Sequence, residues 1–318
     1  MKHLETFMLG VIDNLEREGR YGTAHVYRST LRAFRRYWNE KYAGKSMLIK
    51  TAFTPFCLRQ FSRHLVERML KENSISTYMR MLRAVYNRAL NARLIHFVPG
   101  LFTHVFTGIR ADVKRTLLPK VMGKILLSKN TIQKELEETR SLFALLFLFR
   151  GMPFVDLVRL RKSDLHDGRI TYSRQKTGKP LSIGLTVEAE TLINRCTDPN
   201  PQSPYLFNIL SRENGDEPIR SGSYQEYQCY QAALRKFNRQ LKRLSLALGI
   251  KGKLSSYTAR HTWASTAYHK KCAMGIISTA LGHSSMKVTE AYLKPFENEE
   301  LDRTNKMIIS YVKRCATD

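Results

Sequence analysis

Residues 257–265 are Tyr-Thr-Ala-Arg-His-Thr-Trp-Ala-Ser, residues 281–284 are Leu-Gly-His-Ser, and residues 289–292 are Thr-Glu-Ala-Tyr. The first stretch predicts a helix with Tyr257 and Arg260 three positions apart, and therefore on one face. A glycine such as Gly282 is typical of a helix end, so His283 is expected in a junction. Arginine binds phosphate oxygens, while histidine exchanges protons near neutral pH. The stretches together favour chemistry at a phosphodiester, although each residue alone is common in folded domains.

The charge of the chain indicates a polyanionic partner. The chain has 318 residues, enough for two domains, and its 43% hydrophobic and 10% aromatic content is ordinary for a folded protein. Its 53 Lys and Arg against 27 Asp and Glu give a net charge of +26, with an excess in both halves. We favour nucleic acid as the partner, and the alternative is a generally basic or ribosome-associated protein.

Several classes of protein do not fit the sequence. The five cysteines are scattered and form no C-x-x-C pair, which excludes a disulfide framework and a zinc site. Residues 1–5 do not resemble the start of a signal peptide, and the apolar run Leu142–Phe149 is too short to cross a membrane. We therefore expect a cytoplasmic protein in which this run is a buried helix.

Residues 1–105 predict a small bundle of helices. Tyr27, Leu31, Phe34 and Trp38 recur at helical spacing, and Thr54-Pro55 is typical of a helix start. Arginines line the faces beside the apolar stripes: Arg28, Arg32, Arg35, Arg80, Arg83 and Arg88. A solvated helix face is the alternative, but acidic residues are scarce there and are not expected to pair with the arginines. We therefore predict that these faces contact DNA.

A basic linker is predicted over residues 106–120, followed by a second domain over 121–318. Arg115 in the linker is a further candidate for DNA contact, and Pro119 interrupts regular structure. The pattern over 128–160 predicts a helix, and the runs 168–173 and 180–183 predict a β-hairpin around Gln-Lys-Thr-Gly-Lys. An irregular connection over 198–222 precedes predicted helices at about 223–249, 256–271, 273–281, 286–293 and 299–314.

Together these motifs resemble the tyrosine recombinases of the phage-integrase family. The resemblance lies in residues 257–265, 281–285 and 289–292, in a lysine turn at 175–179, and in a helical region at 76–99. It implies a mainly α fold, with an N-terminal helical-bundle core-binding domain and a C-terminal helical catalytic domain that contains a small antiparallel hairpin or sheet. It also implies a site-specific DNA recombinase or integrase that cleaves and rejoins strands through a 3′-phosphotyrosyl intermediate, with no metal or nucleotide cofactor.

The family's roles transfer to matching positions in this sequence. The resemblance implies that Tyr292 is the nucleophile, that Arg260 holds the scissile phosphate, and that Lys176 protonates the leaving 5′-oxygen. His283 would take or share the proton of the tyrosine. Tyr257 stands where the family usually has a histidine, and it could still donate a hydrogen bond to the phosphate.

A second departure affects the family's first arginine. Residues 150–156 are Arg-Gly-Met-Pro-Phe-Val-Asp, so Pro153 stands at the arginine position while Gly151 and Asp156 are kept. Arg150 lies three residues earlier, and on a helix it would share a face with that position. We therefore predict Arg150 as the substitute, with Arg159 and Arg161 as second candidates. The Arg-Gly-Met run is similar to recombinases of Bacteroidetes-type mobile elements.

The resemblance also implies partners and alternatives. The expected partner is a double-stranded recombination site, bound by a homotetramer in which the 299–314 helix docks on a neighbouring protomer, with possible accessory DNA-bending factors and a nucleoid-associated location. Integration, excision and inversion of DNA are all open. The alternatives are a DNA-binding protein of recombinase descent that has lost catalysis, and a relaxing type IB topoisomerase.

Overall fold

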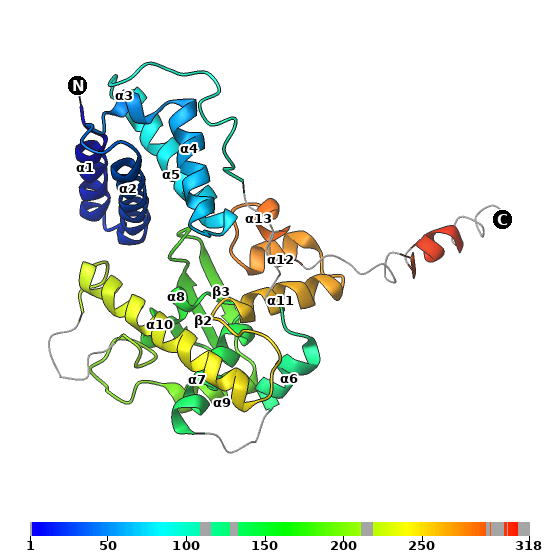
Figure 1. Ribbon diagram of the computed structural model, residues 1–318. Coiled ribbons are helices and arrows are strands. Elements are labelled where there is room, and N and C mark those ends of the chain that lie inside the picture. The colour runs from blue at the N-terminus through cyan, green and yellow to red at the C-terminus, as the bar shows by residue number, and fades with distance from the viewer. Residues whose placement is uncertain are drawn as a thin grey trace. The chain divides into compact units, whose positions relative to one another are not determined.

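The computed structural model describes residues 2–108, 116–127, 133–210, 219–290, 293, 302–303 and 305–310. Its internal contacts divide the chain into two compact units. The first unit comprises residues 1–112 and 220–227, and the second comprises residues 113–219 and 228–318 (Figure 1).

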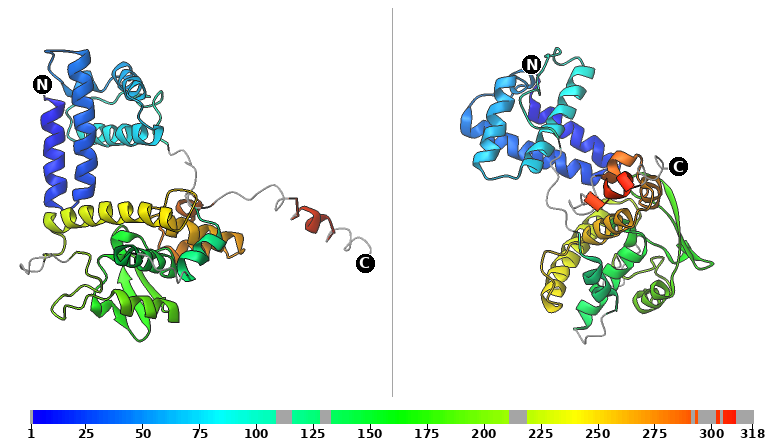
Figure 2. Two further views of the ribbon diagram at one scale, coloured as in Figure 1. Left: turned by 60° about the horizontal axis from the view of Figure 1, so that its bottom comes forward. Right: turned by 90° about the vertical axis from the view of Figure 1, so that its right-hand side faces the viewer.

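The first unit is built from helices. They are α1 (Leu4–Arg17), α2 (Tyr21–Lys41), α3 (Ile49–Ala52), α4 (Pro55–Glu67) and α5 (Glu72–Asn91). Helices α1 and α2 lie side by side, and α2 also packs against α4 and α5 (Figures 1 and 2). The stripe predicted for α2 is buried at Tyr27, Leu31, Phe34 and Trp38, so hydrophobic spacing located the core of the bundle correctly.

Local signals in the sequence fix where α4 begins and what it buries. The Thr54 hydroxyl accepts a hydrogen bond from the Cys57 N–H at 3.2 Å, and Pro55 is the first helical residue, as predicted. Phe61 on α4 and Phe34 on α2 are fully buried and meet edge to face, with ring centroids 4.9 Å apart. This aromatic contact joins the two helices at the centre of the unit.

The remaining elements form the second unit and its connections. The helices are α6 (Pro119–Leu127), α7 (Lys134–Leu148), α8 (Phe154–Leu157), α9 (Val187–Cys196), α10 (Tyr224–Ala247), α11 (Thr258–His269), α12 (Met274–Ala280) and α13 (Met286–Glu290). Buried α7 packs against α6, α9 and α11, while α12 packs against α11 and α13. The predicted helices near 223–249, 256–271 and 273–281 are thus confirmed, whereas α6 and α9 were not predicted. Pro119 begins α6, consistent with the preference of proline for the first turn.

The helix predicted over residues 128–160 is interrupted. Helix α7 ends at Leu148, and the backbone turns at Arg150 and Gly151, whose φ angles are +57° and +70°. Pro153 then precedes the short α8. Two residues in the left-handed region followed by a proline cannot continue an α-helix. The premise that Arg150 and Pro153 share a helix face is therefore wrong.

The predicted hairpin is present and has one further strand. Strands β1 (Leu165–His166), β2 (Arg169–Ser173) and β3 (Pro180–Gly184) form an antiparallel sheet in the order β1-β2-β3. Ser173 pairs with Pro180, and the connecting turn includes Gly178 at a φ of +66°. The chain is thus mainly helical with one small antiparallel sheet, which confirms the predicted fold class.

The predicted helix at 299–314 lies only partly within the described residues. Residues 302–303 and 305–310 are helical. Met307, Ile308 and Ile309 in this segment are exposed.

Candidate active site

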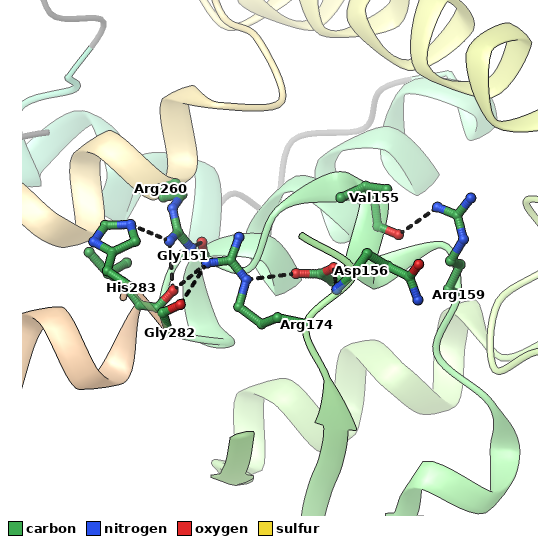
Figure 3. A network of polar contacts seen from close by, with 10 residues as sticks. Gly151, Val155, Asp156, Arg159, Arg174, Arg260, Gly282 and His283 are labelled. Carbon is green, nitrogen blue, oxygen red and sulfur yellow. Dashed lines mark hydrogen bonds and ion pairs between the residues drawn. The ribbon is translucent and has the colours of Figure 1, made fainter. Parts of the chain in front are cut away.

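The candidate site is a buried network of polar groups in the second unit. It joins Arg260 on α11, Arg174 at the end of β2, Asp156 on α8, and the backbone and side chain of residues 281–283 after α12 (Figure 3). Arg174, Asp156, Arg260 and His283 are each less than 10% exposed. Charged groups are seldom buried unless they have partners. The hydrogen bonds of each buried residue therefore explain how its side chain is fixed in the site.

Arg260 is anchored by acceptors from two other segments. Its Nη1 donates to the Gly151 carbonyl at 2.8 Å, and its Nη2 donates to the Leu281 carbonyl at 2.7 Å. The same Nη2 lies 2.8 Å from Nε2 of His283. Arginine has no acceptor atoms, so His283 must accept this hydrogen bond. The structure thus brings together Arg260 and His283, two residues that the sequence had placed in one site.

Arg174 joins the same network from the other side and was not predicted from the sequence. Its Nη1 donates to the carbonyls of Leu281 at 2.7 Å and Gly282 at 3.3 Å, and its Nε donates to Asp156 at 3.2 Å. The signal for it was available, because side chains alternate between the two faces of a strand. Ile170 and Tyr172 are the buried residues of β2, and Arg174 is the next position on that face.

Asp156 fixes the base of the hairpin turn. One carboxylate oxygen accepts from the Gln175 N–H at 3.0 Å, and the other accepts from Arg174. Burial raises the pKa of the Asp156 carboxyl, while the Gln175 N–H and the nearby Arg174 and Arg260 oppose that rise. The carboxyl therefore links α8 to the strand that carries Arg174.

His283 is held in one tautomer. Because Nε2 accepts from Arg260, the ring proton is assigned to Nδ1, which donates to the Thr289 hydroxyl at 2.8 Å. Burial lowers the pKa of His283 to about 4, and the charges of Arg260, Arg174, Lys176 and Lys179 act in the same direction. The imidazole is therefore neutral at neutral pH, with a lone pair on Nε2 directed at Arg260.

Two glycines allow the close packing of the arginines. A Cβ on Gly151 would lie 2.9 Å from Cα of Arg260, and one on Gly282 would lie 2.5 Å from Cδ of Arg174. Both glycines have positive φ angles, +70° and +65°. Gly282 also ends α12, because its N–H donates to the Thr279 carbonyl at 2.9 Å. The helix end predicted there is confirmed.

Lys176 lies in the exposed turn between β2 and β3. Its charge contributes to the lowered pKa of His283, so it acts on the site electrostatically. Tyr257 immediately precedes α11 and is 51% exposed, whereas Arg260 in the first turn of that helix is 2% exposed. Tyr292, the predicted nucleophile, lies outside the described residues, as does Arg115.

The three arginines proposed for the first-arginine role lie in different surroundings. Arg150 lines a shallow groove with residues 179–182 of the hairpin and with α12. Arg159 donates to the Val155 carbonyl at 3.2 Å and stacks on Tyr230, on the side of Asp156 away from Arg260 (Figure 3). Arg161 is exposed at the start of a short 3₁₀ turn. The guanidinium of Arg174, from the end of β2, donates to the Asp156 carboxylate at 3.2 Å.

The arginines predicted to contact DNA lie on α2 and α5. Arg32, Arg35, Arg80, Arg83 and Arg88 are exposed, and Arg28 is partly exposed. The expectation that none pairs with an acidic residue is wrong: Arg28 lies 2.9 Å from Glu16, and Arg35 lies 3.0 Å from Glu5. The acids come from α1, which packs on α2, so the pattern of α2 alone could not reveal them. Solvent-exposed pairs of this kind contribute little stability.

The described part of the chain contains no group of three or more His, Cys, Asp or Glu side chains placed to hold a metal ion. Within the same residues, no helix is long and apolar enough to cross a membrane.

Comparison with known families identifies the class. Residues 115–299 match the Phage integrase family, and residues 3–100 match the Phage integrase SAM-like domain. The chain therefore belongs to the phage integrase family, as its motifs predicted.

Similar proteins are tyrosine recombinases. A tyrosine recombinase of Pseudothermotoga lettingae is 25% identical over 79% of this chain and 89% of its own length. Tyrosine recombinase XerC of Rickettsia africae is 24% identical over 88% of each chain. A Tn1549 transposon integrase solved with transposon right end DNA has a similar fold, with a TM-score of 0.65 at 13% identity over 97% of this chain and all of that one. XerH site-specific recombinase, solved on a palindromic difH substrate, has a TM-score of 0.64 at 17% identity, over 92% of this chain and 83% of that one.

The lowered pKa of His283 predicts an acid-dependent loss of stability. In the unfolded chain His283 is protonated below its ordinary pKa of 6.5, whereas in the folded site it is protonated only below about pH 4. Within that window His283 lowers the unfolding free energy as pH falls, by up to about 1.4 kcal/mol per pH unit. His283→Gln removes this contribution. Denaturant unfolding at several pH values should show the wild type losing stability relative to the variant, and parallel curves would contradict the assigned burial.

Close packing at Gly151 predicts that even one methyl group disturbs the site. Gly151→Ala should lower stability by more than Gly168→Ala, although both glycines have φ angles near +70°, at +70° and +66°. Only at Gly151 does the added Cβ meet the backbone of Arg260, whereas nothing lies within 4 Å at Gly168. The backbone cost of an alanine at positive φ is similar in the two variants. The difference between their thermal unfolding temperatures therefore measures the packing contribution at Gly151. Equal losses would show that the contact with Arg260 is not close in solution.

Proposed function

We propose that this tyrosine recombinase cleaves one DNA strand with Tyr292 and rejoins it within the site built around Arg260 and His283. The observation that carries the proposal is the direct contact of Nη2 of buried Arg260 with Nε2 of His283 at 2.8 Å, in a chain that carries an excess of 26 positive charges. A buried guanidinium beside a neutral imidazole suits an anion that must be held while a proton moves.

The proposed reaction requires no external energy source. The hydroxyl oxygen of Tyr292 attacks the scissile phosphorus, and the bond to the 5′-oxygen breaks. Lys176 protonates that oxygen, and Nε2 of His283 accepts the tyrosine proton. The product is a 3′-phosphotyrosyl bond with a free 5′-hydroxyl, and reversal of the same steps joins strands again.

Arrival of the phosphate changes the electrostatics of His283 in the required direction. In the structure, Arg260 donates to Nε2 of His283. A phosphate oxygen that accepts from Arg260 would release this lone pair for the tyrosine proton. Burial and, after it, the charges of Arg260 and Arg174 lower the pKa of His283 to about 4. The negative charge of the phosphate would offset these positive charges, and so make the imidazole a stronger base.

The helical bundle provides the second part of the proposed DNA contact. We assign DNA binding to Arg28, Arg32, Arg35, Arg80, Arg83, Arg88 and Arg115. Arg28 and Arg35 can exchange their exposed partners Glu16 and Glu5 for phosphates at small cost, because such ion pairs are weak in water. Binding through many such contacts should weaken steeply as salt rises.

The assembly and the biological role extend this proposal. We propose a homotetramer on the recombination site, in which the apolar residues at 307–309 dock on a neighbouring protomer, with accessory bending proteins in some reactions. Their exposure supports this role, because clustered apolar side chains on a surface favour a partner. We propose that the chain is encoded by a mobile element, consistent with its similarity to a transposon integrase. We also propose that it acts in the cytoplasm, associated with the nucleoid.

Covalent capture tests the proposed nucleophile. Sheared genomic DNA from the source organism is incubated with wild-type protein or Tyr292→Phe, and SDS is added to trap covalent complexes. We expect DNA attached to the wild type and none attached to the variant, because only a tyrosine hydroxyl forms the phosphotyrosyl bond. Sequencing of the attached ends identifies the cleavage site.

A nicked synthetic duplex that carries this site then serves as a trapping substrate. The nick releases a short strand after cleavage, so the adduct cannot religate. Equal adduct from wild type and Tyr292→Phe would rule out Tyr292 as the nucleophile. Binding without adduct in either protein would instead identify a DNA-binding protein that has lost catalysis.

A further inference from the structure

We infer that Arg174 is the second phosphate-binding arginine of this active site, in the position that Pro153 leaves without a cation. The inference rests on the proposed function, because it assigns a further catalytic residue to the same reaction. It is carried by the contacts that Arg174 makes with Leu281, Gly282 and Asp156. Arg174 itself lies outside the DNA-cleavage motifs of the sequence.

The two guanidinium groups lie close to each other. Nη1 of Arg174 and Nη2 of Arg260 each donate to the same carbonyl oxygen, that of Leu281, at 2.7 Å. The two nitrogens are therefore no farther apart than twice that distance. Like charges brought this close inside a protein repel one another, and an anion between them relieves that repulsion.

The side chain of Arg174 is held in one direction. Asp156 fixes Nε, and the backbone of residues 281–282 fixes Nη1. Among the residues that the structure describes, none provides a hydrogen-bond acceptor for Nη2 of Arg174. A guanidinium clamped through two of its three nitrogens and available at the third is preorganised for a ligand oxygen.

The charges of the network suit a phosphodiester anion. Among the described residues of this network, the buried charged groups are the guanidinium cations of Arg174 and Arg260 and the carboxylate of Asp156. The charges of Lys176 and Lys179 reach His283 as well. A phosphodiester has one negative charge shared over two non-bridging oxygens. Two arginines that approach from different segments can each bind one oxygen, and the added charge of the pentacoordinate transition state strengthens both contacts.

The pairing of Arg174 with Asp156 accounts for the altered first-arginine motif. Pro153 carries no cation, yet Asp156 three residues later is retained and is paired with Arg174. The acid therefore positions a guanidinium that comes from β2 instead of from its own segment. Gly282 makes room for it, because a Cβ there would lie 2.5 Å from Cδ of Arg174.

A structural role is the competing account of Arg174. In that account the side chain only ties the hairpin to α8 and to the end of α12, and its loss disturbs the site through the fold. Arg140 provides a matched control, because it is 8% exposed, forms an ion pair with Glu137 and donates to the Ile125 carbonyl at 3.0 Å. Its replacement also removes a buried, paired arginine from the second unit.

The experiment compares cleavage of two nicked duplexes that carry the captured site. One has a normal scissile phosphate, and the other has a methylphosphonate, in which a methyl group replaces one charged oxygen. Arg174→Ala should cleave the phosphate about 100-fold more slowly than wild type, and the methylphosphonate with a loss of less than about tenfold. Cleavage of the neutral methylphosphonate depends less on the missing cation, because less negative charge develops on it. A disturbed fold would instead lower the cleavage rate of both substrates by the same factor.

Companion variants separate the assignments. Arg174→Lys keeps one charge beside Asp156 and should lose less activity than Arg174→Ala. Arg150→Ala should cleave both substrates within about tenfold of wild type, and Arg140→Ala should show any loss equally on both. Equal losses for Arg174→Ala on the two substrates would overturn the inference, and so would a phosphate-selective loss in Arg150→Ala.

Failure of the proposed function gives a different result. In that case wild type forms no adduct that depends on Tyr292. The role of Arg174 in phosphate binding is then tested by non-covalent binding to a mixed-sequence duplex. If Arg174 contacts a phosphate, Arg174→Ala should reduce the slope of log affinity against log salt by about one relative to Arg140→Ala. An unchanged slope would then overturn the inference independently of cleavage.

Discussion

Two guanidinium groups share the carbonyl oxygen of Leu281, and the geometry of the site depends on this arrangement. Arg174 and Arg260 are both buried, so each must have acceptors within the protein or lose the stabilisation that water would provide. The shared carbonyl, the Gly151 and Gly282 carbonyls, and Asp156 supply these acceptors. Backbone oxygens stabilise the charges without neutralising them, so the site keeps an excess of positive charge.

The surrounding fold brings these acceptors into place. The break after α7 turns the Gly151 carbonyl toward Arg260, and the short α8 presents Asp156 to the hairpin. The glycine at the end of α12 exposes the Leu281 carbonyl to both arginines and the Gly282 carbonyl to Arg174. Two turns and the short helix α8 therefore hold the buried charged groups, while α7 packs against α9 and α11.

Much of this organisation could be predicted from the sequence, for identifiable reasons. Hydrophobic spacing located the buried stripe of α2, and a glycine-containing turn between β-like runs located the β2–β3 hairpin. The motifs around Arg260 and His283 predicted a common site because their order along the chain is distinctive. The interruption at residues 150–153 was missed, because the apolar pattern continues through it while two positive φ angles end the helix.

Arg174 was missed for a related reason. An arginine at the end of a strand is usually exposed, and only its alternation with Ile170 and Tyr172 indicates the buried face. Arg150 was favoured on the assumption of a continuous helix, which the structure does not contain. The ion pairs of Arg28 and Arg35 were likewise hidden, because their partners come from a neighbouring helix.

The central claim is that Arg174 and Arg260 form one phosphate site. A crystal structure of Tyr292→Phe bound to its captured DNA duplex tests it most directly. The account predicts both guanidinium groups within hydrogen-bond distance of the non-bridging oxygens of the scissile phosphate. A structure in which Arg150 binds that phosphate, while Arg174 remains only on Asp156 and the 281–282 backbone, would contradict it.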